Sequence, residues 1–181
     1  MCQKLTKLLI LCFIMGLFGF CAHAKESLYM LPYEQKEALN AFKNALKNAQ
    51  NEIKISIYSF THNDIANILK ENAKRGVQVH IIYDKESNIG NKASSIGYLA
   101  KYNNISVCLL SGLRAKNKQH FGIMHQKMAI IDGHTLVIGS ANWSKNAFEN
   151  NFETLLISDN KELIDKANWA FEKMRQTCTR F

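Results

Sequence analysis

Two short apolar runs, Met-Ala-Ile-Ile and Leu-Val-Ile, stand on either side of the dipeptide Asp132-Gly133. Asp-Gly is a strong signal for a tight hairpin, because type I′ turns need positive φ at both central residues. If these two residues form the whole turn, Ile131 pairs with His134. The chain must then fold around an antiparallel pair of strands that are apolar enough to be buried.

Polar residues stand at the open end of this predicted hairpin. In the tight register His125 lies opposite Ser140; with a longer loop, Asn142 lies opposite His125 and Ser140 opposite Lys127. Strand side chains return to one face at every second residue, so either register brings all four groups to one patch. The alternative is an edge hairpin whose ends are polar only because they meet water.

The remaining pattern alternates strands and helices. Proline occurs once in 181 residues, and the chain has no long linker or internal repeat, which favours one compact domain. Strands are expected at 52–60, 77–83 and 105–110, in the two apolar runs beside Asp132-Gly133, and at 152–158. Helices are expected at 33–49, from 61 or 63 to 75, and at 93–102, 144–149 and 161–174. This order predicts an α/β fold, a mixed β-sheet covered by helices on both faces.

The first 24 residues have the layout of a secretory signal peptide. Lys4 and Lys7 precede an apolar run, and Ala22-His23-Ala24 is a small-x-small cleavage site. We therefore expect export to the periplasm or cell envelope and a mature domain of residues 25–181. The alternative is an uncleaved N-terminus that keeps the protein at the membrane.

The net charge and the cysteines indicate the class of partner and the redox state of the compartment. A formal net charge of +8 favours an anionic partner, either nucleic acid, a membrane surface or a phosphorylated metabolite. After signal removal, Cys108 and Cys178 remain. They form a disulfide in an oxidising compartment or are two unrelated thiols, and the sequence leaves both possibilities open.

The four polar residues suit the chemistry of a phosphodiester. A neutral imidazole can attack phosphorus and form a phosphoryl-histidine intermediate. A lysine and neutral amide or hydroxyl donors can stabilise charge on the non-bridging oxygens, and a second histidine can protonate the leaving alkoxide. His125, Lys127, Asn142 and Ser140 supply the nucleophile, the cation and the donors.

The pattern His125-x-Lys127-x-x-x-x-Asp132, followed by Gly139-Ser140-x-Asn142, resembles the signature of the phospholipase D superfamily. The short chain with one motif is similar to the bacterial Nuc-type endonucleases. The resemblance implies that His125 is the nucleophile, that Lys127, Asn142 and Ser140 bind phosphate, and that Glu153 holds the imidazole. It also implies that Asp132 and Gly139 support the fold.

One motif supplies one histidine, whereas the reaction needs a nucleophile and an acid. The resemblance therefore implies a homodimer in which two His125 side chains face each other in one active site. The rival acid is His120 of the same chain. Metal and other cofactors are not expected, because His120 and His125 lack the spacing of a helical zinc pair and no Asp-x-Asp or cysteine cluster lies nearby.

A basic loop precedes the motif and gives the predicted substrate class. Its cations could follow a nucleic-acid backbone and its phenylalanine could stack on a base; the candidates are Arg114, Lys116, Lys118, His120 and Phe121. The expected function is a metal-independent endonuclease acting on nucleic acid, DNA in particular. The alternatives are a phospholipase D acting on membrane phospholipid and a surface DNA-binding protein without catalysis.

Overall fold

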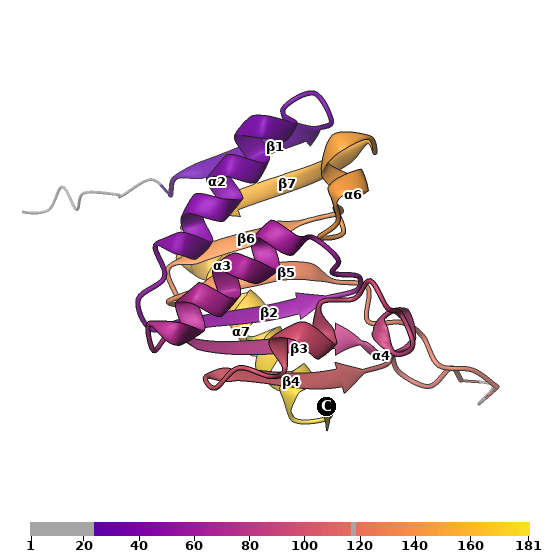
Figure 1. Ribbon diagram of the computed structural model, residues 1–181. Helices are drawn as coiled ribbons and strands as arrows, with labels where there is room; N and C mark the ends of the chain where they lie inside the picture. Colours follow the sequence, from indigo (N-terminus) through magenta and orange to yellow (C-terminus); the bar gives the residue numbers. More distant parts are fainter. Residues whose placement is uncertain (1–23, 117–118) are drawn as a thin grey trace, which may run out of the picture.

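A computed structural model of the protein describes residues 24–116 and 119–181, which form one eight-stranded mixed sheet (Figure 1). The strand order is β1-β7-β6-β5-β2-β3-β4-β8. Strands β2, β3 and β4 are parallel to one another, and every other neighbouring pair is antiparallel. The strands are β1 (Glu26–Leu31), β2 (Glu52–Ile57), β3 (Gln78–Asp84), β4 (Ile105–Leu110), β5 (Lys127–Ile131), β6 (Thr135–Gly139), β7 (Glu153–Ser158) and β8 (Thr179–Arg180).

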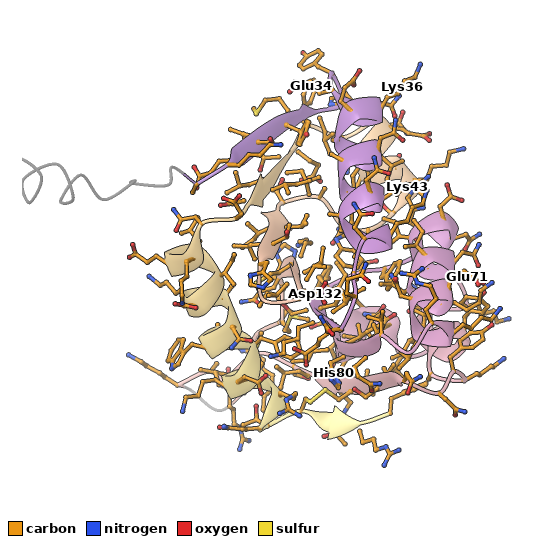
Figure 2. All side chains as sticks on the ribbon, turned by 90° about the vertical axis from the view of Figure 1, so that its left-hand side faces the viewer. Glu34, Lys36, Lys43, Glu71, His80 and Asp132 are labelled. Atoms are coloured by element: carbon orange, nitrogen blue, oxygen red, sulfur yellow. A yellow bond between two sulfur atoms is a disulfide. The ribbon has the colours of Figure 1, made fainter. Side chains whose placement is uncertain are left out.

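Helices cover both faces of the sheet, as the sequence predicted. The helices are α2 (Gln35–Lys47), α3 (Asn63–Lys74), α4 (Lys85–Asn88), α5 (Ile96–Leu99), α6 (Lys145–Glu149) and α7 (Lys161–Arg175). Helices α2 and α3 pack on one face over the larger core, which includes Phe42 and Leu69. Helix α7 lies on the other face over a smaller core that includes Ile164 and Phe171, and Figure 2 shows the sheet edge-on between these two layers.

The structure adds short elements that the sequence pattern did not reveal. Strands β1 and β8 and helix α4 were not predicted, and the expected helix at 93–102 is only the single turn of α5. Strand β1 has no clear alternation of its own and exists through its pairing with β7, from Glu26↔Ser158 to Leu31↔Glu153. Such edge elements depend on distant partners, so local pattern is a poor guide to them.

The hairpin has the predicted turn residues but a different register. Asp132 and Gly133 have φ values of 52° and 68°, as Asp-Gly suggested. However, the His134 amide donates to the Ile131 carbonyl at 2.9 Å, so the loop has three residues and Ile131 pairs with Thr135. Both predicted registers are therefore wrong by one residue. The pairing ends at Met128↔Ile138, and His125 and Asn142 lie in segments beyond it.

The Asp132 carboxylate ties this turn to the start of β2. One oxygen accepts from the amides of Asn51 and Glu52 at 2.8 and 2.9 Å, and the other accepts from the Gln50 amide at 2.8 Å. Burial alone would raise the pKa of Asp132, but the three amide donors outweigh it and the pKa lies below its usual value. Asp132 lies at the sheet edge that faces the viewer in Figure 2.

Replacing Asp132 with asparagine should lower the free energy of unfolding by about 1–3 kcal/mol near neutral pH, because one amide then faces an NH₂ group. Asparagine tolerates the positive φ, so the backbone is not an additional cost. The carboxylate contributes fully above its unfolded pKa, and the contribution is lost as the pH falls through the lowered folded pKa. Urea denaturation of both proteins should therefore give curves that converge in acid; a constant difference would contradict this account.

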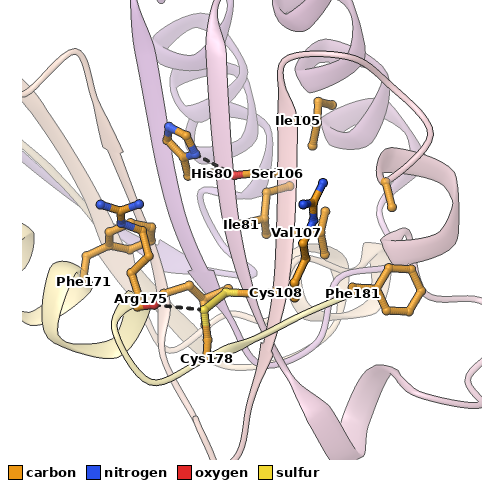
Figure 3. Close-up of a pocket in the computed structure, with 13 residues that line it drawn as sticks. His80, Ile81, Ile105, Ser106, Val107, Cys108, Phe171, Arg175, Cys178 and Phe181 are labelled. Carbon is orange, nitrogen blue, oxygen red and sulfur yellow. Dashed lines mark hydrogen bonds between the residues drawn. A yellow bond between two sulfur atoms is a disulfide. The ribbon is translucent and has the colours of Figure 1, made fainter.

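A disulfide resolves the question that the two cysteines left open. Cys108 of β4 and Cys178, which follows α7, are bonded, with their Cα atoms 5.7 Å apart. The bond lies beside a surface cavity of about 430 Å³ between α7 and β4, lined by His80, Arg175 and Phe181 among others (Figure 3). None of the residues that line this cavity belongs to the predicted site.

The predicted signal peptide lies outside the described residues except for Ala24. Among the helices that the structure describes, none has the length and apolar character needed to cross a bilayer.

Candidate active site

The predicted site residues gather at one edge of the sheet, where β2, β3 and β4 end. Strand β5 begins there with Lys127 and β7 begins there with Glu153. Strand β6 ends there at Gly139, just before Ser140. The carboxyl edge of parallel strands is a common place for ligand binding in α/β folds.

His125 and Lys127 make the central contact of this edge. Lys127 Nζ lies 3.0 Å from His125 Nε2 and also donates to the His125 carbonyl at 3.0 Å. An ammonium group can only donate, so His125 Nε2 is the acceptor and the neutral ring carries its proton on Nδ1. The imidazole is exposed, whereas Lys127 is only 5% exposed.

Burial lowers the pKa of Lys127, and the nearby charge of Glu153 opposes this shift. The ammonium group is thus less well solvated than that of a surface lysine. A phosphate oxygen that reached it would replace the missing hydration with a strong charge-assisted hydrogen bond.

Glu153 has a different partner from the one expected. Ser140 Oγ donates a short hydrogen bond to Glu153 Oε2, and the Thr154 amide donates to Ser140 Oγ at 3.0 Å. Asn151 Nδ2 donates to the other Glu153 oxygen at 3.4 Å. Within the described part of one protomer Glu153 therefore holds Ser140 and not His125. A role in holding an imidazole stays a prediction that a second copy of the chain would have to fulfil.

Asn142 and Gly139 complete this side of the site. Asn142 Oδ1 is buried and has no hydrogen-bond partner among the described residues, which is unusual for a buried polar atom. A Cβ on Gly139 would lie 2.1 Å from the Thr154 carbonyl oxygen. Only glycine therefore allows the close approach of β6 and β7 that brings Ser140 beside Glu153.

Tyr58 belongs to the site and was missed in the sequence. Its ring centroid lies 4.5 Å from that of His125 at an interplanar angle of 62°, and Lys127 Nζ lies 5.1 Å from the Tyr58 ring centroid. The phenol ring thus contacts both the imidazole and the ammonium group. Nothing in one sequence distinguishes an aromatic residue at the end of a strand from ordinary core.

The basic loop forms a two-stranded finger that projects from this edge (Figure 1). The Gly112 amide donates to the Gly122 carbonyl at 2.8 Å, and further out Arg114 pairs with Phe121. The Arg114 guanidinium lies 5.8 Å from the centroid of the Phe121 ring, which is 59% exposed. Lys116 and His120 also lie on the finger, whereas Lys118 lies outside the described residues.

A family model described as "Cardiolipin synthase, PLD-like domain" matches residues 42–175, which is more than half of the chain. The chain belongs to the phospholipase D superfamily. Its Nuc-type character is shown by two solved structures. NucT from Helicobacter pylori is 55% identical with a TM-score of 0.86, and the match covers 88% of this chain and 100% of that one. Nuc from Salmonella typhimurium, a phospholipase D family member, is 25% identical with a TM-score of 0.74, covering 88% and 99%.

Several curated relatives are named mitochondrial cardiolipin hydrolase. The mitochondrial cardiolipin hydrolase of Mus musculus is 29% identical over 144 residues, which are 80% of this chain and 60% of that protein. This chain therefore spans little more than half the length of the curated relatives that it matches.

Two histidines lie on or next to the finger, and His120 is the candidate for the acid within the same chain. His125 lies at the base of the finger, and His120 lies further out, where its carbonyl accepts from the Ala115 amide at 2.9 Å. Within residues 24–116 and 119–181, no group of three or more His, Cys, Asp or Glu residues could hold a metal ion.

Proposed function

We propose that this protein is an exported, metal-independent endonuclease that hydrolyses phosphodiester bonds of nucleic acid, DNA in particular. Residues 25–181 form its nuclease domain, and two copies form one active site. The observation that carries this proposal is the contact between His125 Nε2 and the partly desolvated Lys127 ammonium group, at the edge of the sheet where the strands that carry Ser140 and Glu153 also meet.

In the proposed first step, His125 Nε2 attacks phosphorus. The N–P bond forms, the P–O bond to the leaving nucleotide breaks, and the departing oxygen takes a proton from the His125 imidazolium of the second subunit. Lys127 and the Asn142 amide group stabilise the charge on the non-bridging oxygens. Water, deprotonated by that second imidazole, then attacks phosphorus and breaks the N–P bond, which returns both rings to their starting states.

An uncovered apolar face supports the proposed homodimer. Helix α7 covers the sheet over β5 and the start of β6, but not over β1 and β7. Leu28, Leu156 and Ile138 form a row across β1, β7 and β6, and Leu28 and Ile138 are 60% and 37% exposed. Met30 beside them is 49% exposed. A second copy on this face would bury apolar surface next to the strand ends that carry the site.

Export is proposed from the N-terminal pattern, and the disulfide supports it. Bonds such as Cys108–Cys178 form and persist in oxidising compartments such as the periplasm or the outer cell envelope. An uncleaved N-terminus would add membrane association to this location.

Hydrolysis of a membrane phospholipid is the second candidate function. It is favoured by two aliphatic residues on the finger, Leu113 and Ile123, which are 92% and 51% exposed and cannot stack on bases as Phe121 could. The finger cations fit phosphates of either substrate.

The test is a substrate panel with protein that lacks residues 1–24. Plasmid DNA, single-stranded DNA, RNA and cardiolipin vesicles are incubated with the protein, with and without EDTA. We expect cleavage of nucleic acid at the same rate in EDTA. Lipid hydrolysis alone would favour the second candidate, and binding of DNA without cleavage would favour a surface DNA-binding protein. Activity that EDTA removes and one divalent ion restores would contradict the phosphoryl-histidine mechanism.

A further inference from the structure

Two buried polar side chains lie just behind the site, at the end of β3 and in the turn that follows it. Asp84 is fully buried and Asn88, the last residue of α4, is 2% exposed. Neither belongs to the phospholipase D signature. Buried groups of this kind need hydrogen-bond partners, and their partners lead to the nucleophile.

Asp84 fixes the backbone directly before His125. Its Oδ2 accepts from the Met124 amide at 2.9 Å, and its Oδ1 accepts from the Ser87 amide at 2.9 Å. Residue 124 is where the chain returns from the projecting finger and enters the sheet. The Asp84 carboxylate therefore fixes the position of the backbone directly before His125.

Asn88 fixes Tyr58, whose ring contacts the imidazole of His125. Asn88 Nδ2 donates to the Tyr58 carbonyl at 2.7 Å and to the Asp84 carbonyl at 2.8 Å, and Ser94 Oγ donates to Asn88 Oδ1 at 2.8 Å. The Tyr58 amide in turn donates to the Gln126 carbonyl at 2.8 Å. The chain is thus held on both sides of His125, at Met124 and at Gln126.

We propose that Asp84 and Asn88 are positioning residues for the nucleophile, because they hold the His125 backbone and the Tyr58 ring in one geometry. The inference rests on the proposed function, in which His125 Nε2 attacks phosphorus. His125 itself precedes β5 and has no ladder pairing, so its place depends on these contacts and on its hydrogen bonds with Lys127. A displacement of about 1 Å at a reacting atom can reduce the rate about 100-fold.

Asp84→Asn tests the proposal, and Asp132→Asn is its matched control. Both carboxylates accept backbone amides, but Asp132 does so at the opposite edge of the sheet. We expect both variants to melt at lower temperature. Only Asp84→Asn should also lower kcat, by about 10- to 100-fold with KM little changed.

Single-turnover kinetics separate a positioning role from a merely structural one. A structural defect removes active molecules, so the amount of phosphoenzyme formed per protein falls while the remaining molecules react at the normal rate. A positioning defect leaves that amount near the wild-type value and slows the reaction of every molecule. We expect the second result for Asp84→Asn.

A spectroscopic readout makes the geometry testable without any reaction. The Tyr58 ring should shift the Cε1–H resonance of His125, which is assigned by its absence in His125→Ala, and Tyr58→Leu gives the position without the ring. Asp84→Asn should move the resonance toward the Tyr58→Leu position, and Asp132→Asn should leave it in place. If Asp84→Asn fails to fold, Asn88→Ala should give the same movement through the released Tyr58 carbonyl.

The outcomes distinguish the two proposals. If phosphoenzyme forms normally in Asp84→Asn and Asn88→Ala and the resonance does not move, the positioning role is wrong. If the resonance moves as expected but the wild-type protein forms no phosphoenzyme, the geometry is right and the proposed function is wrong.

Discussion

Replacing His125 with alanine should reduce phosphodiester cleavage by at least about 10⁴-fold, because no other group then forms the bond to phosphorus. The imidazole is exposed, so the variant should keep the circular dichroism spectrum and melting temperature of the wild type. In the wild type, rapid quench into denaturant during turnover should trap a histidine bonded to phosphorus, with the remaining part of the cleaved strand still esterified to that phosphorus. If single-turnover cleavage proceeds and no covalent adduct of protein and nucleic acid is found, water attacks directly and His125 is only a base.

The source of the acid is decided by a tandem fusion of two copies in which only one carries His125→Ala. If the acid is the His125 of the second subunit, the fusion loses nearly all activity, since every active site lacks one of its two rings. If the acid is His120 of the same chain, half of the activity remains. His120→Ala in both copies is the control and should change the rate little.

Replacing Lys127 with alanine should lower the rate about 100- to 1000-fold, the usual cost of removing one strong donor to a developing oxyanion. Because burial lowers the pKa of Lys127, the ammonium group is lost at a lower pH than that of an exposed lysine. Wild-type activity should therefore decline on the alkaline side earlier than the reference lysine pKa of about 10.4 suggests.

Lys127→Arg is the matched variant for this alkaline decline. A guanidinium group stays protonated throughout the range, so any activity that it supports should lack this decline. A Lys127→Ala protein with near-normal activity would contradict the role of Lys127. An unchanged alkaline decline in Lys127→Arg would assign the decline to another group.

The sequence was informative where a local rule applies and uninformative where distant contacts decide. Positive φ at Asp132 and Gly133 followed from the residue types, and so did the helices that carry an apolar stripe. The hairpin register did not follow, because it depends on a loop closed by His134 and on a carboxylate bonded to the start of another strand.

The same contrast holds in the site. His125, Lys127 and Ser140 were found from a spaced pattern and Glu153 from the resemblance to a known family, and the structure gathers them at one edge. The partner of Glu153 was not predictable, because it depends on the close approach of two strands at a glycine. Tyr58, Asp84 and Asn88 carry no pattern at all, since each acts through a contact with a residue more than 25 positions away.

In the proposed mechanism, the hydrogen bond between Lys127 and His125 occupies the lone pair of the attacking nitrogen as long as no substrate is bound. Neutral electrophiles that reach the site meet a ring nitrogen already engaged with an ammonium group. A charged phosphodiester instead competes for that ammonium group, and the same contact that binds the ester releases the nitrogen that attacks it. If His125 and Lys127 act as proposed, the charge of the substrate frees its own nucleophile, and the selectivity of the site would not depend on an enclosing pocket.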